Sequence, residues 1–219
     1  MMREYDLVVF DWDGTLMDST GHIVHAIQQA CSDLALPVPA REAASHVIGL
    51  RLADAMRQFC PDRQADRLPD LIDAFRRHYQ ANLDQVTLFD AARETLEAIR
   101  AQGIFVAIAT GSSRAGLDRA LAAAGIGELF DATRTVDECH SKPHPDMLLQ
   151  LTDFFGVECR RALMVGDTSH DLLMANHAGC HGVGISHGAH ASEHLQRCQP
   201  LAIVHSLPEL ASWLLPRLC

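Results

Sequence analysis

The amino-acid sequence predicts an α/β fold in which a parallel sheet lies between two layers of helices, with an all-helical unit inserted into it. Short apolar runs alternate along most of the chain with helical stretches of about ten residues, which is typical of a parallel sheet covered on both faces. The strongest runs are apolar at every position, as expected of strands buried on both sides. Between residues 18 and 85 no strand pattern occurs, so we interpret this block as an insertion.

Six segments carry the strand pattern. Three are strong because they combine β-branched and other apolar residues without interruption, and they cover Tyr5–Phe10, Ile104–Thr110 and Ala162–Gly166. Three are shorter or weaker, and they cover Phe130–Val136, His181–Ile185 and Leu201–Val204. These segments are the expected strands of the sheet.

Helical patterns fill most of the intervals between these strands and close the chain. Gly103 and Gly125 follow two of the helices, as glycine commonly does after a last helical turn. The expected helices cover Ala91–Ala101, Ser112–Ala124, Pro145–Phe155, Thr168–Ala178 and Leu207–Leu214.

The inserted unit begins shortly after the first strand. Asp18–Thr20 has the composition of a helix start, and an amphipathic stretch follows until Pro37 interrupts it. From Ala40 to Leu83 the whole sequence is helical in pattern. We therefore expect a helical domain over residues 18–87 and a main domain formed by residues 1–17 and 88–219.

The composition is that of an acidic globular protein, with 219 residues, a formal net charge of −10 and 48% hydrophobic residues. Nucleic acid is not an expected partner, because no stripe of lysine and arginine is present to neutralise its phosphates. No run approaches the roughly 18 apolar residues of a membrane span, and the amino terminus lacks a signal pattern, so no membrane partner is expected. Seven scattered cysteines without a C-x-x-C pair favour reduced thiols and a cytoplasmic location.

Residues suited to phosphoryl transfer stand at the ends of the expected strands. Asp11 and Asp13 follow the first strand, Thr110 ends the second strong one, Asp167 follows the third, and Lys142 lies in a loop. The carboxyl ends of parallel strands share one edge of the sheet, where such sheets bind ligands. Carboxylates can act as nucleophile, proton donor and ligands of a hard cation, and a lysine can neutralise phosphoryl oxygens. The set predicts phosphoryl transfer through a covalent enzyme intermediate.

Four motifs at these positions resemble, in order, those of the haloacid dehalogenase superfamily of phosphatases. They are Asp11-Trp12-Asp13-Gly14-Thr15, Thr110-Gly111, Lys142-Pro143-His144-Pro145-Asp146, and Gly166-Asp167-Thr168 with Asp171. The match spans essentially the whole chain and is closest to phosphoglycolate-phosphatase-like members. It implies a Rossmann-like α/β/α catalytic core, with the helical domain as a cap inserted after the first motif.

The resemblance also implies catalytic and metal-binding roles. Asp11 would attack phosphorus and form an aspartyl-phosphate, while Asp13 would protonate the leaving oxygen and then activate water. Asp11, the backbone carbonyl of Asp13, and Asp167 would hold Mg²⁺, with Asp171 as an indirect or water-mediated partner of the metal. Lys142 would neutralise the growing negative charge and orient Asp11.

Phosphate binding and substrate choice are expected from a second group of residues. By the same resemblance, Thr110, Lys142 and the amides near Trp12 and Gly111 would bind phosphoryl oxygens. Arg51 lies in a loop of the helical domain that resembles the substrate-facing segment of the cap. This arginine could pair with a substrate carboxylate, or it could be a solvated surface side chain.

Asp13 separates the possible activities. A hydrolytic dehalogenase needs no second acid because halide leaves without a proton, whereas a phosphate ester benefits from one. A phosphonate-cleaving member would need a lysine in the cap, and residues 18–85 contain none. We therefore expect an Mg²⁺-dependent hydrolase of a small phosphorylated metabolite such as 2-phosphoglycolate.

A phosphosugar mutase of the β-phosphoglucomutase type is the alternative function. A binding or regulatory protein whose active site is no longer used is a third possibility. The oligomeric state, monomer or homodimer, stays open.

Two positions depart from the family pattern. Asp90-Ala91 stands where a Pro-Gly turn is common as the chain re-enters the core, which bears on the hinge and on the position of the cap. Gly111 stands where asparagine is frequent, which removes a contact to the phosphate or to a catalytic oxygen.

Three histidines near the carboxyl terminus, His187, His190 and His194, have helical spacing. No cysteine or acid completes an obvious tetrahedral set with them, so a polar surface helix is favoured over a zinc site.

Overall fold

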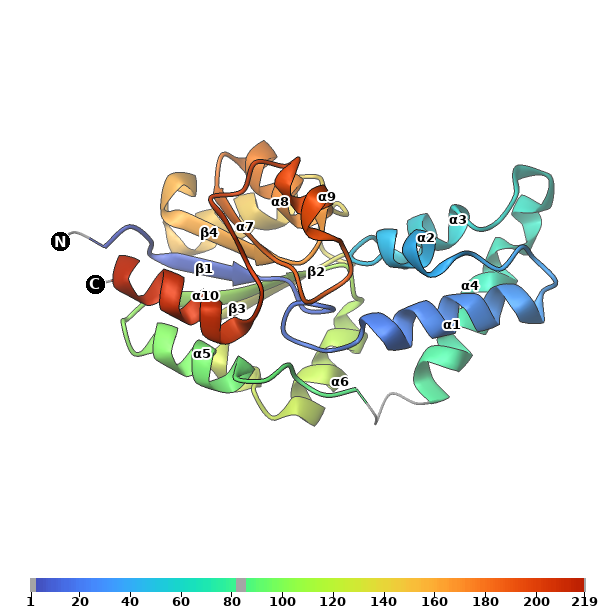
Figure 1. The fold of residues 1–219 in the computed structure, drawn as a ribbon, viewed down its shortest axis with the longest axis horizontal. Coiled ribbons are helices and arrows are strands. Elements are labelled where there is room, and N and C mark those ends of the chain that lie inside the picture. The colour runs from blue at the N-terminus through green and yellow to red at the C-terminus, as the bar shows by residue number, and fades with distance from the viewer. Residues whose placement is uncertain (1–2, 82–85, 219) are drawn as a thin grey trace.

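The computed structural model describes residues 3–81 and 86–218, and it contains one six-stranded sheet in which all strands run parallel (Figure 1). The strand order is β3-β2-β1-β4-β5-β6, with β1 at the centre between β2 and β4. The strands span Leu7–Phe10 (β1), Phe105–Thr110 (β2), Ala132–Thr135 (β3), Ala162–Gly166 (β4), His181–Ile185 (β5) and Ala202–Val204 (β6). All six expected strands are present, so the predicted α/β class is confirmed.

Helices cover both faces of the sheet, and alternate strand residues point to the two layers. Val8 and Phe10 of β1 pack in a cluster with α5 (Ala92–Arg100), α6 (Arg114–Ala124) and α10 (Leu207–Leu214). Leu7 and Val9 point the other way, into a cluster with α7 (Asp146–Phe155) and α8 (Ser169–Ala178). The core therefore has the three-layer α/β/α arrangement. The polar surface helix expected around His187, His190 and His194 is only partly present, because the five-residue helix α9 (Ser192–Gln196) contains His194 alone of the three.

Four helices form a separate block that projects from one end of the sheet (Figure 1). They are α1 (Thr20–Asp33), α2 (Arg41–His46), α3 (Leu52–Arg57) and α4 (Leu68–Ala81), with a 3₁₀ turn, η1 (Asp62–Arg67), before α4. This helical block, α1 to α4, has its own hydrophobic cluster, in which α1 and α4 pack against each other. The expected helical pattern ran to Leu83, and residues 82–85 lie outside the described residues.

The two chain crossings between the sheet and the helical block pair with each other. Met17 bridges to Leu88, and the Phe89 amide donates to the Leu16 carbonyl at 2.9 Å. Just after this junction Ala91 has φ 61° and ψ 18°, the left-handed conformation that glycine adopts most easily. The Asp90-Ala91 pair therefore keeps the conformation of a glycine-containing turn, with a methyl group in it.

Among the described residues, no helix is both long enough and apolar enough to span a bilayer. Six cysteines fall in this part of the chain and all are free thiols; the seventh, Cys219, lies outside it.

Candidate active site

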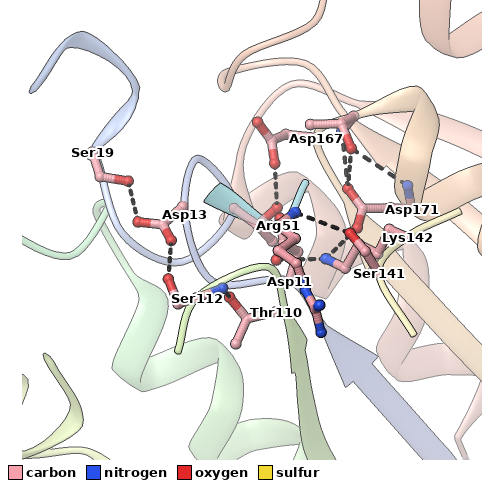
Figure 2. A network of polar contacts seen from close by, with 12 residues as sticks. Asp11, Asp13, Ser19, Arg51, Thr110, Ser112, Ser141, Lys142, Asp167 and Asp171 are labelled. Atoms are coloured by element: carbon pink, nitrogen blue, oxygen red, sulfur yellow. Dashed lines mark hydrogen bonds and ion pairs between the residues drawn. The ribbon is translucent and has the colours of Figure 1, made fainter. Parts of the chain in front are cut away.

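The carboxyl edge of the sheet gathers the motif residues into one site (Figure 2). Asp11 directly follows β1, Thr110 ends β2, and Asp167 directly follows β4. Because β1 lies between β2 and β4, these three positions are neighbours in space. The Asp11 amide donates to the Val165 carbonyl at 2.9 Å, which fixes the start of the loop after β1.

Lys142 is completely enclosed and lies between two carboxylates. Its Nζ is 2.7 Å from Asp11 Oδ1 and 2.6 Å from Asp171 Oδ1, and the lysine is only 2% exposed. Burial alone lowers the pKa of this lysine, but the charges of Asp11 and Asp171 more than offset it, so the pKa is raised. The lysine stays protonated and holds Asp11 in place.

Asp171 is held by donors on both oxygens. Oδ1 contacts Lys142, and Oδ2 accepts from the Thr168 hydroxyl at 2.6 Å and from its amide at 3.1 Å. Thr168 and Asp171 thereby form the capping box that begins α8. Asp171 thus pairs with Lys142, and its expected indirect role at the metal stays a prediction.

Asp167 is oriented by the loops around it. Its Oδ1 accepts from the Thr15 hydroxyl at 2.9 Å, and its Oδ2 accepts from the Ala189 amide at 2.6 Å. A Cβ at Gly14 or Gly188 would lie 2.3 or 2.1 Å from Asp167 Oδ2, so both positions require glycine. Burial and the neighbouring charge of Asp171 raise the pKa of Asp167 to about 7.

The acid cluster of Asp11, Asp167 and Asp171 fits a hard cation. Oxygens of all three lie within 4.8 Å of one another, and all three residues are buried. Within the described part of the chain, Asp11 Oδ2 has no hydrogen-bond partner, and Asp11 Oδ1 has only its ion pair with Lys142. Burial, together with the charges of Asp171 and Asp167, raises the pKa of Asp11 in spite of the lysine. Carboxylate oxygens with spare lone pairs and excess negative charge are the donor set that Mg²⁺ takes.

Asp13 lies in a different environment, to one side of the acid cluster (Figure 2). Its Oδ1 accepts from the Ser19 hydroxyl at 2.8 Å and its Oδ2 from the Ser112 hydroxyl at 2.9 Å. Burial raises the pKa of Asp13, which favours its protonated form. Its expected role as a metal ligand concerns its backbone carbonyl and stays a prediction.

The expected phosphate-binding residues surround the same edge. Thr110 is buried at the end of β2, and its hydroxyl oxygen accepts from the Ser112 amide at 3.1 Å. Trp12 is buried in the core with its ring among apolar residues. A Cβ at Gly111 would lie 2.4 Å from the carbonyl oxygen of Gly49, in the helical block. The glycine in place of asparagine thus makes room for the loop of residues 49–51.

Arg51 donates hydrogen bonds to two residues of the core. Its amide donates to Ser141 Oγ at 2.9 Å, and its Nη2 donates to the Val136 carbonyl at 2.5 Å. It therefore ties the helical block to the loops after β3. Its pairing with a substrate carboxylate stays a prediction.

Two histidines of the core form a second connection to the helical block. His170 and His190, both from the core, donate through Nε2 to the same carbonyl oxygen, that of His46 at the end of α2, at 2.9 and 3.2 Å. His190 also accepts from the Ser169 amide through Nδ1, so both of its ring nitrogens have partners. His190 is buried, contrary to the expected surface helix, whereas His194 on α9 is exposed.

Sequence reasoning did not assign the hydroxyl partners of the acids. Ser19 was expected to begin a helix, but its side chain makes no cap bond and instead contacts Asp13. Ser112 lies 99 positions from Asp13, and Thr15 lies 152 positions from Asp167. Their only sequence signal is that each adjoins a motif.

Comparisons with known proteins show the family to which the chain belongs. The family model for haloacid dehalogenase-like hydrolases matches residues 8–185. "Probable phosphatase IndB" of Dickeya dadantii strain 3937 is 36% identical over 212 residues, covering 93% of this chain and 91% of the relative. A phosphoglycolate phosphatase of Mannheimia succiniciproducens is 31% identical, covering 86% and 88%. A crystal structure described as a predicted phosphoglycolate phosphatase from Haemophilus somnus 129pt superposes with a TM-score of 0.83 at 27% identity, covering 97% and 99%.

The fold and the site define a hydrolase with a Rossmann-like α/β/α core and an acid-rich centre at the carboxyl edge of its sheet. The chain belongs to the haloacid dehalogenase-like hydrolase family.

Proposed function

We propose that this protein is an Mg²⁺-dependent phosphatase that releases inorganic phosphate from a small phosphorylated metabolite through an aspartyl-phosphate on Asp11. The relatives named as phosphatases support the phosphatase activity. The observation that carries the mechanism is the contrast between two acids. Asp11 is paired with Lys142 and has one oxygen without a hydrogen-bond partner, whereas Asp13 accepts hydrogen bonds from two serine hydroxyls and its burial raises its pKa, which favours the protonated form.

The first half-reaction transfers the phosphoryl group to Asp11. An oxygen of the Asp11 carboxylate bonds to phosphorus while the bond from phosphorus to the ester oxygen breaks. Asp13 gives its proton to that leaving oxygen, so an alcohol departs. Lys142 keeps Asp11 oriented and offsets the negative charge of the phosphoryl group. Thr110 and the Gly111 amide, at the same edge of the sheet, would bind the phosphoryl oxygens.

The second half-reaction restores the enzyme. The Asp13 carboxylate takes a proton from water as the water oxygen bonds to phosphorus, and the bond to Asp11 breaks. Inorganic phosphate and a free Asp11 carboxylate result. A bound Mg²⁺, held by Asp11, Asp167 and the Asp13 carbonyl, would supply the positive charge that lets a phosphate dianion approach these acids.

The helical block serves as the cap domain in this account, with residues 18–87 as cap and residues 1–17 and 88–219 as catalytic core. Its own hydrophobic cluster and its contacts through Arg51 and His46 support a unit that docks over the site. 2-Phosphoglycolate is the first candidate substrate, because relatives of this chain bear the name phosphoglycolate phosphatase. A cytoplasmic location suits such a metabolite.

The test is phosphate release from a panel of phosphorylated metabolites, with Mg²⁺ and with EDTA, beside the variant Asp11→Asn. We expect turnover that needs Mg²⁺ and falls by at least about 10³-fold in the variant. Steady release without a phosphorylated activator excludes the mutase alternative, which no feature of the described site favours. Metal-independent turnover, or an active Asp11→Asn variant, would contradict the proposal.

A further inference from the structure

A pocket of about 550 Å³ lies between the helical block and the core. Helices α1, α3 and α4 and the loop before α3 form one side of it, and α6 with the loop after β2 forms the other. Pockets of roughly 300–1,000 Å³ enclose ligands the size of a drug molecule. The space is therefore larger than a compact two-carbon phosphate ester requires.

The walls of this pocket are mostly apolar. The helical block presents aliphatic and aromatic side chains from three helices and the loop before α3, and the core side adds α6; the partly buried apolar residues among them include Ile23, Leu50, Leu52 and Ile72. Ile23 and Ile72 are only partly buried, so their surfaces remain available to a ligand. Water held against such walls is unfavourable, and an apolar group that displaces it is stabilised in proportion to the area covered.

The pocket begins at the proton donor of the proposed reaction. Trp12, Asp13, Gly111 and Ser112 line its core side, whereas Asp11 is not among the described lining residues. Since Asp13 protonates the ester oxygen, the rest of the leaving alcohol must extend past Asp13. The geometry therefore directs the leaving group, and not the phosphoryl group, into the apolar space.

Two of the three cations in the described lining already have partners in the protein. Arg51 already donates to the Val136 carbonyl, and Arg76 pairs with Asp73 at 3.2 Å on its own helix. Arg119 is exposed on α6. A compact carboxylate next to the phosphoryl group would leave the apolar walls uncovered.

We propose, on the basis of the proposed function, that the preferred substrate is the phosphomonoester of an alcohol carrying a bulky, uncharged and largely apolar ring, which fills the pocket between the helical block and α6. This inference replaces 2-phosphoglycolate as the expected preferred substrate, because 2-phosphoglycolate has a small charged leaving group that the apolar walls do not match.

The test compares three esters of primary alcohols, so that the leaving groups differ mainly in size and charge: 2-phenylethyl phosphate, ethyl phosphate and 2-phosphoglycolate. Values of kcat/KM are measured with Mg²⁺, and 4-nitrophenyl phosphate reports general phosphatase activity. We expect 2-phenylethyl phosphate to exceed both of the others by at least about tenfold, since even one methylene in an apolar pocket is worth roughly that factor.

Substitutions in the pocket wall distinguish an effect on substrate choice from a general loss of protein stability. Ile72→Gln and Ile23→Gln, on two different helices, should lower the ratio of kcat/KM for 2-phenylethyl phosphate over ethyl phosphate several-fold. Ile72→Met should keep the ratio, because it preserves apolar volume. Leu149→Gln is the matched control, since Leu149 is an exposed apolar residue on α7, away from the pocket.

The outcomes are distinct. A preference for 2-phosphoglycolate, equal rates for the three esters, or ratios unchanged in both glutamine variants would overturn the inference while leaving the phosphatase intact. Failure to hydrolyse any ester, 4-nitrophenyl phosphate included, would overturn the proposed function and this inference with it.

Discussion

At the scale of single residues, Asp11 and Asp13 are only two positions apart but have different polar partners. Asp11 faces a lysine and two further acids, while Asp13 faces two serine hydroxyls. A pair of acids whose environments differ in this way can divide the roles of nucleophile and proton donor. The division is a consequence of the strand end, since the chain turns between the two residues and sends their side chains apart.

The substitution Asp13→Asn tests this division. With an alkyl phosphate we expect the rate of alcohol release to fall by about 10²- to 10⁴-fold, because the leaving oxygen loses its proton donor. With 4-nitrophenyl phosphate, whose leaving group departs without protonation, the initial burst of nitrophenol should be much less affected. Rapid-mixing measurements of both bursts, with Ser112→Ala as a milder control, make the comparison. An equal loss with both esters would speak against Asp13 as the acid.

Ala91 is a residue in a conformation that suits glycine. A non-glycine residue in the left-handed region is strained by roughly 1–2 kcal/mol. Replacing alanine by glycine removes this strain but lowers the stability by about 0.4–1 kcal/mol, because glycine increases the conformational entropy of the unfolded chain. Ala91→Gly should therefore raise the free energy of unfolding by up to about 1 kcal/mol. Urea denaturation measures this change. The parallel variant Ala101→Gly, at a helix end with φ −61°, should destabilise instead.

At the scale of elements, the sequence predicts the features that depend on neighbouring residues in the chain. It does not predict the contacts between residues that are far apart in the sequence. The strands β1, β2 and β4 were predicted because their apolar runs are local and uninterrupted. The motif acids were predicted because each directly follows such a strand. The contacts of Ser112, Thr15 and Arg51 were not, because their partners lie on other elements and only folding brings them together.

The close approach of the loop of residues 49–51 to Gly111 yields an element-scale prediction. In Gly111→Ala the added methyl would collide with the Gly49 carbonyl, and separation of the helical block relieves the collision more easily than a change in the core. We expect kcat/KM to fall by about 10- to 100-fold, with little change in Tm. Gly21→Ala is the control, because a Cβ there meets nothing within 4 Å. A large loss of Tm with unchanged kinetics would contradict this assignment.

At the scale of the whole molecule, the two edges of the sheet carry different arrangements of charged residues. The carboxyl edge collects four buried acids and one buried lysine, which disfavours folding without a bound cation. The amino edge carries ion pairs that tie the chain together: Asp6, just before β1, pairs with Arg161, just before β4, and with Arg3. Function is thus placed at one edge, and part of the stability at the other.

The pH dependence of stability should reveal the Asp6 pair. Its hydrogen bond with Arg161 is the largest cause of a lowered pKa at Asp6. A lowered folded-state pKa stabilises the fold fully above the unfolded value of about 3.9, and this contribution is lost as pH falls through the folded value. Asp6→Asn should lower Tm at neutral pH, and the difference should vanish under acid conditions. The exposed pair of Glu158 and Arg160 is the control, where Glu158→Gln should change little.

Trapping the phosphoryl group on Asp11 is the most direct test of whether this residue is the nucleophile. In the Asp13→Asn variant the second half-reaction is slow, so incubation with 4-nitrophenyl phosphate and Mg²⁺ should accumulate the intermediate. Borohydride reduces an acyl phosphate to an alcohol, which converts the modified aspartate to homoserine, and peptide mass spectrometry locates it. We expect homoserine at position 11 and none in the doubly substituted Asp11→Asn, Asp13→Asn chain. Phosphoryl transfer to any other residue, or a nitrophenol burst with position 11 unmodified, would contradict it.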